Sequence, residues 1–441
     1  MDFYGREEER AELERIRERS LANARFTVVT GRRRVGKTEL LERAYHDGRT
    51  PYLHFLVTRR SERDLCATFQ EEAQRVLGRP FLGRADRFGA LFEELLEYAV
   101  ATPFTLVIDE FQELDRIDPG IFGEIQGAWD RWHGKAKVNL VACGSVNRMM
   151  TKIFLDDSQP LYGRNTGRLD VGPFPTAVLR RILADRNPRY SGRDLLALWT
   201  LTGGVARYVE LFMDVGATTR GAMLDEVFGP SSAYIDEGRV VLSDEFGKEG
   251  GVYFSILAAI AAGRTSYGDI RNAVGEEIGG HLTKLERVYG FVSKARPFRG
   301  RESGRDFHYR IDDAFFRFWF RFVHRYMHLV EQRQRGALRQ IVERDFDVFA
   351  GTSLERWFRT KLLEEGRYTR IEGWWDRKGE NEIDLVCENE ADGTLDFREV
   401  KTDPRRLDPQ ALGLKVAAFF RKNPDLRRER FGVGGLSLDD M

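Results

Sequence analysis

Short apolar runs of strand length alternate with segments of helical spacing over the first 172 residues. The runs at 26–29, 104–108 and 138–143 are mostly apolar, which is typical of parallel strands that are buried on both faces. Apolar residues recur at helical spacing after the first run, from about residue 39. This alternation predicts an α/β fold around a parallel sheet.

The pattern changes after residue 172 and again near residue 247. Residues 177–228 have helical spacing throughout. Three short helices then follow, the second of which begins with the capping residue Ser266. Strand-like runs at 291–294 and 308–311 come next, on either side of an Arg-Gly turn. Helices followed by a strand–turn–strand segment predict a winged helix.

The C-terminal part again contains strands. Runs at 382–386 and 395–401 are strand-like, turn residues separate them at 390–393, and a helix is expected from about Pro409. The predicted domains are 1–172, 173–246, 247–330 and 331–441.

An unusually dense aromatic run covers residues 315–322. It could form a platform on which bases stack. Its two arginines, Arg317 and Arg321, are four apart and would share one helix face, so a core helix that packs at a domain junction is the preferred interpretation.

The first strand leads into a segment that matches the P-loop pattern G-x-x-x-x-G-K-[ST] at every fixed position. The matching residues are Gly31, Arg32, Arg33, Arg34, Val35, Gly36, Lys37 and Thr38. Glycines let backbone N–H groups surround phosphates, the lysine can reach the β- and γ-phosphates, and the threonine hydroxyl can ligate Mg²⁺. The segment therefore predicts a binding site for ATP and Mg²⁺.

Two acids follow the second of these strands and one small polar residue ends the third. Asp109 is expected to hold the Mg²⁺ shell and Glu110 to polarise the attacking water. Ser145, or Asn147 two residues on, could sense the γ-phosphate, although an ordinary strand-to-helix turn explains these residues equally well.

Two arginines lie in a glycine-flanked segment after the third strand. Arg164 or Arg168 could be an arginine finger that stabilises charge in a neighbouring subunit's transition state, which would make the chain a homo-oligomer. Surface arginines are common, so the alternative is that neither has a catalytic role.

A second group of charged residues lies in the C-terminal strands. Glu399 and Lys401 are two apart on one strand and project to the same face, and Asp384 lies on the partner strand. Two carboxylates with an ammonium suit a Mg²⁺ or Mn²⁺ site that cleaves phosphodiesters. The alternative is an exposed hairpin with paired charges.

The predicted wing is locally basic. Its basic residues are Lys294, Arg296, Arg299, Arg301, Arg305 and Arg310, and only Glu302 and Asp306 oppose them. Such a stretch favours contact with the phosphates of DNA. The alternative is a lid or a protein contact.

Several of these motifs together resemble the archaeal-type ATPase family of the AAA+/STAND group of P-loop NTPases. They are 3–7, the P-loop, 109–112, 143–145 and 162–164. The resemblance covers roughly residues 1–330 and implies a three-layer α/β core, a helical lid and a winged helix. It also implies that Arg6 and Glu7 lie beside the nucleotide base. The lid motif Gly-Gly-x-Pro carries Ala206 in place of proline, which removes one expected contact to the adenine.

The C-terminal part resembles the PD-(D/E)xK nuclease fold, and in particular the nuclease-like domain often fused to archaeal-type ATPases. By this resemblance Glu355, on a preceding helix, becomes a further metal ligand beside Asp384 and Glu399. The expected function is an ATPase coupled to DNA binding and metal-dependent cleavage. The alternative is a nucleotide-controlled switch whose nuclease-like domain is inactive.

Composition limits the partners and the compartment. The 441 residues contain 70 Lys and Arg and 70 Asp and Glu, so only a local patch could attract DNA. Cys66, Cys143 and Cys387 lie mostly within apolar runs, which predicts buried thiols in a reducing compartment. Neither a signal peptide nor an apolar stretch of about 20 residues is found, so a cytoplasmic protein with no membrane partner is expected.

Overall fold

The computed structural model describes residues 1–78, 83–145, 148–246, 250–300, 307–376, 379–426 and 431–441, with side chains at all of them except 148, 244 and 245. The chain divides into two compact units, one formed by residues 5–173 and the other by residues 1–4 and 174–441. The two units are described separately below.

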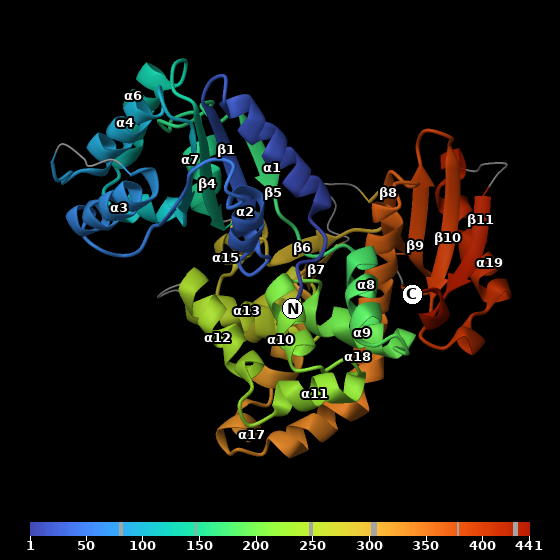
Figure 1. Cartoon of the computed structure of the whole chain (residues 1–441). Coiled ribbons are helices and arrows are strands. Elements are labelled where there is room, and N and C mark those ends of the chain that lie inside the picture. The colour runs from blue at the N-terminus through green and yellow to red at the C-terminus, as the bar shows by residue number, and fades with distance from the viewer. Residues whose placement is uncertain (79–82, 146–147, 247–249, 301–306, 377–378, 427–430) are drawn as a thin grey trace. The chain divides into compact units, whose positions relative to one another are not determined.

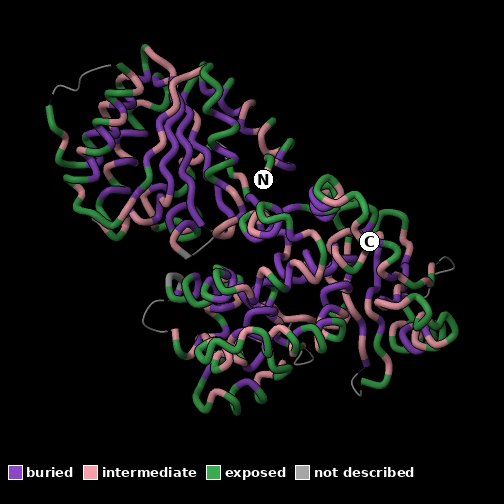
Figure 2. Tube along the Cα trace, turned by 60° about the horizontal axis from the view of Figure 1, so that its bottom comes forward, coloured by how far each residue is buried: buried purple, intermediate pink, exposed green. Residues whose placement is uncertain are grey.

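The first unit is built on a parallel sheet of five strands. In spatial order these are β2 (Tyr52–Leu56), β3 (Phe104–Asp109), β4 (Val138–Ser145), β1 (Arg25–Gly31) and β5 (Gly167–Asp170). Strands β3 and β4 are buried along their whole length, as their apolar sequences require (Figure 2). The predicted α/β fold with a parallel sheet is confirmed.

Helices cover both faces of this sheet (Figure 1). Helices α1 (Glu7–Ser20) and α2 (Lys37–Tyr45) pack on one face, and α3 (Glu62–Leu77), α4 (Phe88–Tyr98) and α6 (Ile121–Trp132) pack on the other. The shorter elements are η1 (Phe111–Glu113), α5 (Leu114–Ile117) and α7 (Arg148–Leu155). All parallel strands end at the same edge of the sheet, so the loops after β1, β3 and β4 meet there.

The second unit begins with the helices that the spacing of 177–228 predicts. They are α8 (Thr176–Arg186), α9 (Gly192–Thr202), α10 (Ala206–Asp214), α11 (Arg220–Phe228) and the additional α12 (Ala233–Phe246). Tyr4 belongs to the core of these helices, and the N-terminal ammonium forms an ion pair of 2.6 Å with Asp214. The first residues of the chain are therefore held by the second unit.

The next segment has the predicted order of elements. Helices α13 (Gly250–Ala261), α14 (Tyr267–Val274) and α15 (Gly279–Arg287) precede the antiparallel strands β6 (Val292–Ala295) and β7 (His308–Ile311). The Ser266 side chain accepts a hydrogen bond from the Asp269 N–H, as expected of a cap. The assignment of this segment as a winged helix stays a prediction.

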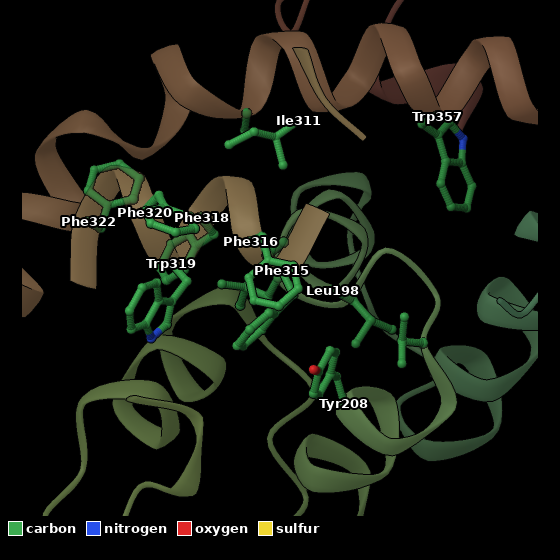
Figure 3. Close-up of a cluster of buried hydrophobic side chains, with 14 of the residues drawn as sticks. Leu198, Tyr208, Ile311, Phe315, Phe316, Phe318, Trp319, Phe320, Phe322 and Trp357 are labelled. Carbon is green, nitrogen blue, oxygen red and sulfur yellow. The ribbon is translucent and has the colours of Figure 1, made fainter. Parts of the chain in front are cut away.

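The aromatic run forms part of the core. It continues from α16 (Ala314–Phe318) into a π-helical segment, η3 (Trp319–His324), and then α17 (Met327–Glu331). Figure 3 shows its rings packed among Leu198, Tyr208 and Trp357. Phe315, Phe316, Phe318 and Trp319 have no exposed surface, so the interpretation as a core helix is confirmed.

The C-terminal part places two helices beside a four-stranded sheet. The strands are β8 (Arg370–Trp375), β9 (Glu382–Asn389), β10 (Thr394–Val400) and β11 (Phe431–Leu436), in the order β11-β10-β9-β8. Strand β9 is antiparallel to β8 and β10, and β11 is parallel to β10. The helices are α18 (Arg335–Glu364) and α19 (Pro409–Lys422), and 3₁₀ turns lie at Pro404–Arg406, Pro424–Leu426 and Leu438–Asp440.

Two further expectations concern the described residues. Cys66, Cys143 and Cys387 are free and buried, as their apolar surroundings predict. Within the described part of the chain, no helix is both long enough and apolar enough to cross a bilayer.

Candidate functional site

The P-loop connects the end of β1 to the start of α2. Its backbone needs glycine twice: Gly36 caps α2 with a φ of 90°, and a side chain on Gly31 would collide with the carbonyl of Val171. The Lys37 ammonium donates hydrogen bonds to the carbonyl oxygens of Gly31 and Arg32, at 2.8 and 3.1 Å. Burial lowers the pKa of Lys37. The loop is thus closed around its lysine.

Asp109, at the end of β3, faces the first turn of α2. Its Oδ2 atom accepts a hydrogen bond of 2.8 Å from the Thr38 hydroxyl, and the Nε2 atom of His54 lies 3.4 Å away. Burial favours a higher pKa for Asp109, but the hydrogen bonds from His54 and Thr38 outweigh it and lower that pKa. The Asp109 carboxylate is therefore charged. It is hydrogen-bonded to Thr38, the residue that the P-loop pattern predicts as a ligand of Mg²⁺.

Glu110 is held in a left-handed backbone conformation with a φ of 52°. Its carboxylate accepts a hydrogen bond from the side-chain amide of Gln112, which is 4% exposed. A side chain at Gly144 would collide with Gln112, so β4 leaves room for this amide. The role of Gln112 has one signal in the sequence, its spacing two residues after Glu110.

Ser145 and Arg6 both lie beside the P-loop. Ser145 is buried and pairs in register with Gly31 across β4 and β1. Arg6 is 7% exposed and donates hydrogen bonds to the carbonyl oxygens of Val35, at 3.2 Å, and of Gly172, at 2.5 Å. The remaining arginines of the loop, Arg32, Arg33 and Arg34, are half-buried. Asn147, the alternative to Ser145, lies outside the described residues.

Of the two candidate finger arginines, Arg164 lies toward the opposite edge of the sheet from the P-loop. The Thr166 N–H donates to the carbonyl of Phe26 at the start of β1, whereas the P-loop follows the end of β1. Arg164 forms an ion pair of 3.1 Å with Asp130 of α6. Arg168 pairs in register with Val28, in the middle of β1, and lies 3.5 Å from Asp170. The finger role of either arginine stays a prediction about a second copy.

The structure brings together the charged residues selected in the C-terminal strands. The Lys401 ammonium lies 3.5 Å from the Asp384 carboxylate and 3.4 Å from that of Glu399. Asp384 also accepts a hydrogen bond of 2.7 Å from the Val400 N–H. Lys415 of α19 donates a hydrogen bond of 3.1 Å to Glu399. This contact is not predicted by the sequence, because nothing in a helical pattern indicates which acid a lysine will pair with.

Glu355 faces the same carboxylates from α18. Burial raises the pKa of Glu355 to about 7, and the charges of Asp384 and Glu382 add to this effect. Among the residues with described positions, no set of three or more His, Cys, Asp and Glu side chains is grouped closely enough to hold a metal ion. The site is therefore a pair of lysine-neutralised carboxylates with a third carboxyl nearby.

The predicted basic wing is largely neutralised by acids of the same chain. Lys294 pairs with Glu286 at 2.6 Å, and Arg310 pairs with Asp312 at 3.2 Å. Arg299 pairs with the buried Glu388 of β9 at 3.1 Å. The Arg296 guanidinium lies 5.4 Å from the Phe307 ring, and Arg301 and Arg305 lie outside the described residues. This geometry weakens the case for the wing as a DNA contact.

Two known families match separate parts of the chain. Residues 3–212 match the family described as an ATPase domain predominantly from Archaea. Residues 319–408 match a family described as archaeal and bacterial proteins of unknown function. The protein MJECL04 of Methanocaldococcus jannaschii is 27% identical over 410 residues, which are 90% of this chain and 87% of that protein.

Solved structures agree with the fold. The Walker-type ATPase PABY2304 of Pyrococcus abyssi is 21% identical with a TM-score of 0.52, over 73% of this chain and 96% of that chain. The ORC2 protein of Aeropyrum pernix, solved with ADPNP and ADP, is 16% identical with a TM-score of 0.50, over 75% and 96% of the two chains. Residues 3–212 thus form an ATPase domain of the archaeal type, with the fold of P-loop ATPases.

Proposed function

We propose that this chain couples ATP hydrolysis to the metal-dependent cleavage of DNA. The ATPase domain supplies the first activity. The observation that carries the second is the position of the Lys401 ammonium, which lies within 3.5 Å of the carboxylates of both Asp384 and Glu399. Phosphodiester cleavage by a metal-dependent nuclease uses such a group of two acids and a lysine.

In the ATPase domain each residue has a definite task. Lys37 would leave the loop carbonyls and bind the β- and γ-phosphates, and the loop N–H groups would surround them. Thr38 and Asp109 would hold Mg²⁺, which neutralises charge on the phosphates. Glu110 would orient the attacking water, and Gln112 would keep the Glu110 carboxylate in place until the nucleotide is bound. Arg6 would hold the P-loop backbone through Val35.

In the C-terminal site the carboxylates can accept a cation. Asp384 Oδ1 and Glu399 Oε2 accept no hydrogen bond from any described residue, so each carboxylate keeps one oxygen for a ligand. Asp384 and Glu399 would hold Mg²⁺ or Mn²⁺, which polarises the scissile phosphate when bound. Glu355 would have to move to join them, because no three such side chains are grouped for a metal in the described part of the chain. Lys401 would orient the attacking water, and Lys415 would keep Glu399 ionised.

The test is a cleavage assay with the full chain on labelled single- and double-stranded DNA. Cleavage should require Mg²⁺ or Mn²⁺, stop with a chelator, and fall about 100-fold or more in Asp384→Asn. Calcium should support binding with little cleavage. The matched control is Glu390→Gln, which removes an exposed carboxylate from the turn between β9 and β10 and should cleave at the parental rate.

One result would refute the nuclease proposal. If the full chain leaves every DNA form intact with either metal, with and without ATP, the C-terminal site is not a nuclease. A preserved ATPase rate and an unchanged melting temperature in Asp384→Asn are required for the positive result to count, because they show that the variant is folded.

A second function is favoured by the ion pairs of the same site. Lys401 and Lys415 already neutralise Asp384 and Glu399 without any metal. Such a site could be stable as an inactive, nuclease-like domain, and the chain would then be a nucleotide-controlled regulatory switch that binds DNA. The absence of cleavage together with ATP-dependent DNA binding would support this alternative.

A further inference from the structure

Four arginines converge beside the C-terminal site, and they define the four-arginine cluster: Arg310 of β7, Arg317 of α16, and Arg356 and Arg359 of α18. The Arg356 guanidinium donates a hydrogen bond of 3.0 Å to the carbonyl of Asp312, which joins α18 to the segment between β7 and α16. Arg317 lies over the ring of Phe349, also on α18, at 5.3 Å. On α18 the cluster residues are three apart and share one face.

The cluster has more positive charge than its neighbours balance. Arg310 is the member with a carboxylate partner, Asp312, which also accepts a hydrogen bond from Ser293. Arg317 and Arg359 make no hydrogen bond and no ion pair with any residue that the structure describes. All four side chains are half-buried, so their charges are partly removed from water. Unpaired charges in such a position are costly unless an anion joins them.

The arginines also act on one another. Burial lowers the pKa of Arg317 to about 10, the charges of Glu355 and Asp312 oppose this lowering, and the charge of Arg310 adds to it. Burial and the charges of Arg317 and Arg310 lower the pKa of Arg356, and burial and Arg310 lower that of Arg359. A guanidinium does not lose its proton at neutral pH, so mutual repulsion remains in the folded chain.

We propose that the four-arginine cluster binds phosphate groups of the DNA strand that enters the site of Asp384, Glu399 and Lys401. The planar guanidinium presents paired N–H donors that match the oxygens of a phosphodiester. Several arginines on one face suit several successive phosphates. This inference rests on the proposed nuclease function. It moves the DNA contact from the wing as a whole, where Lys294 and Arg299 are paired with acids, to a surface formed by β7, α16 and α18.

The position of the cluster supports this ligand. Glu355 precedes Arg356 on α18 and lies within electrostatic reach of Asp384, Lys401 and Arg317. Glu355, Arg356 and Arg359 therefore share one helix, and Glu355 links that helix electrostatically to Asp384 on β9. A strand whose scissile phosphate lies at Asp384 would present its neighbouring phosphates to the arginines of this helix.

The test measures DNA affinity against salt concentration with calcium present and without turnover. Arg317→Gln and Arg359→Gln should each weaken binding about ten-fold and reduce the slope of log affinity against log salt by about 0.9 for duplex DNA. The matched control is Arg344→Gln. Arg344 lies on α18, as Arg359 does, and its side chain is 70% exposed and pairs with its neighbour Asp345. It should keep the parental affinity and slope.

Melting temperatures separate a binding role from a structural one. Without DNA, Arg317→Gln should melt close to the parental temperature, because Arg317 makes no hydrogen bond and no ion pair with a described residue. A large drop in melting temperature that accompanies the loss of affinity would overturn the proposal, and so would unchanged affinity and slope in both variants. Inorganic phosphate serves as a further probe. Inorganic phosphate could raise the melting temperature of the parental chain while both variants keep the parental slope of log DNA affinity against log salt. The cluster would then bind free phosphate, and its assignment to the DNA strand would be wrong.

The cleavage assay keeps the two proposals apart. If the parental chain cleaves no DNA but the salt slope falls in Arg317→Gln and Arg359→Gln, the phosphate site is supported and the nuclease function is refuted. If the parental chain cleaves DNA but the salt slope is unchanged in both variants, the nuclease function is supported and the phosphate site is refuted.

Discussion

At the scale of single residues, the ATPase domain combines a buried lysine with two acids that have different surroundings. Asp109 is bonded to Thr38 and His54, which suits a permanent ligand. Glu110 has a strained backbone and one side-chain partner, Gln112. A carboxylate held by a single amide can be released when a nucleotide arrives, so Glu110 is the residue suited to turnover.

We predict that Glu110→Gln abolishes ATP turnover and leaves nucleotide affinity nearly intact. The substitution keeps the size of the side chain and removes the base, so the rate should fall by about 10² to 10⁴. Lys37→Ala should instead lose much of the binding, because it removes the charge opposite the phosphates. The measurements are steady-state hydrolysis and the affinity for ATP.

The control for this prediction is Asp115→Asn, which removes a carboxylate five residues further along, on α5. It should hydrolyse ATP at the parental rate. Hydrolysis by Glu110→Gln at the parental rate would show that another group activates the water.

At the scale of elements, helix α12 and the π-helical segment η3 are packed too closely for a side chain at Gly238. A Cβ there would overlap the ring of Trp319. That ring cannot move aside easily, since its Nε1–H donates a hydrogen bond of 2.7 Å to the carbonyl of Ile235 and the ring has no exposed surface. Glycine in this helix is therefore a packing requirement.

We predict that Gly238→Ala destabilises the chain by about 1–3 kcal/mol, because the added methyl group forces the two elements apart. Gly221→Ala is the matched control. It adds the same group to the helix α11, where nothing lies within 4 Å, and should be neutral or stabilise by about 0.5–1 kcal/mol. Chemical denaturation of both variants gives the free energies of unfolding. Equal free energies of unfolding for the two variants would show that η3 moves to make room for the methyl group.

At the scale of the whole molecule, the predicted finger role of Arg164 requires a neighbouring copy of the chain. Arg164 and its partner Asp130 are 29% and 47% exposed, and such surface ion pairs contribute little to stability. Arg164 is therefore free to exchange Asp130 for a phosphate presented by a second chain. Its distance from its own P-loop, across the length of β1, excludes a role within one chain.

We predict that Arg164→Ala lowers the ATPase rate by about 10³-fold and that mixing it with Glu110→Gln restores part of the activity. The mixture pairs an intact P-loop site from one variant with an intact arginine from the other. Arg131→Ala, which breaks a surface pair on α6, serves as the control and should not change the rate. A monomer that hydrolyses ATP at the full rate would contradict the prediction.

Local sequence was sufficient for the strands with long apolar runs and for most of the helices, but it did not locate strands β2, β5, β8 and β11 or helix α12. The buried strands β1, β3 and β4 follow from apolar runs, and the start of α19 at Pro409 follows from its turn chemistry. The P-loop is contiguous, so its residues and their roles could be listed from the sequence. The convergence of Asp384, Glu399 and Lys401 could also be expected, because antiparallel neighbours and alternate strand positions place side chains on one face.

Other features depend on contacts between residues far apart in the chain, which no local pattern encodes. Lys415 on α19 contacts Glu399 on β10, and Gly144 on β4 leaves the space in which Gln112 reaches its near neighbour Glu110. The wing illustrates the same limit. Its basic composition predicts a contact with phosphates, yet Arg299 is bound to Glu388, 89 residues away. The sequence determines which charges a segment carries, and tertiary packing decides which of them are paired and which, like Arg317 and Arg359, are left for a ligand.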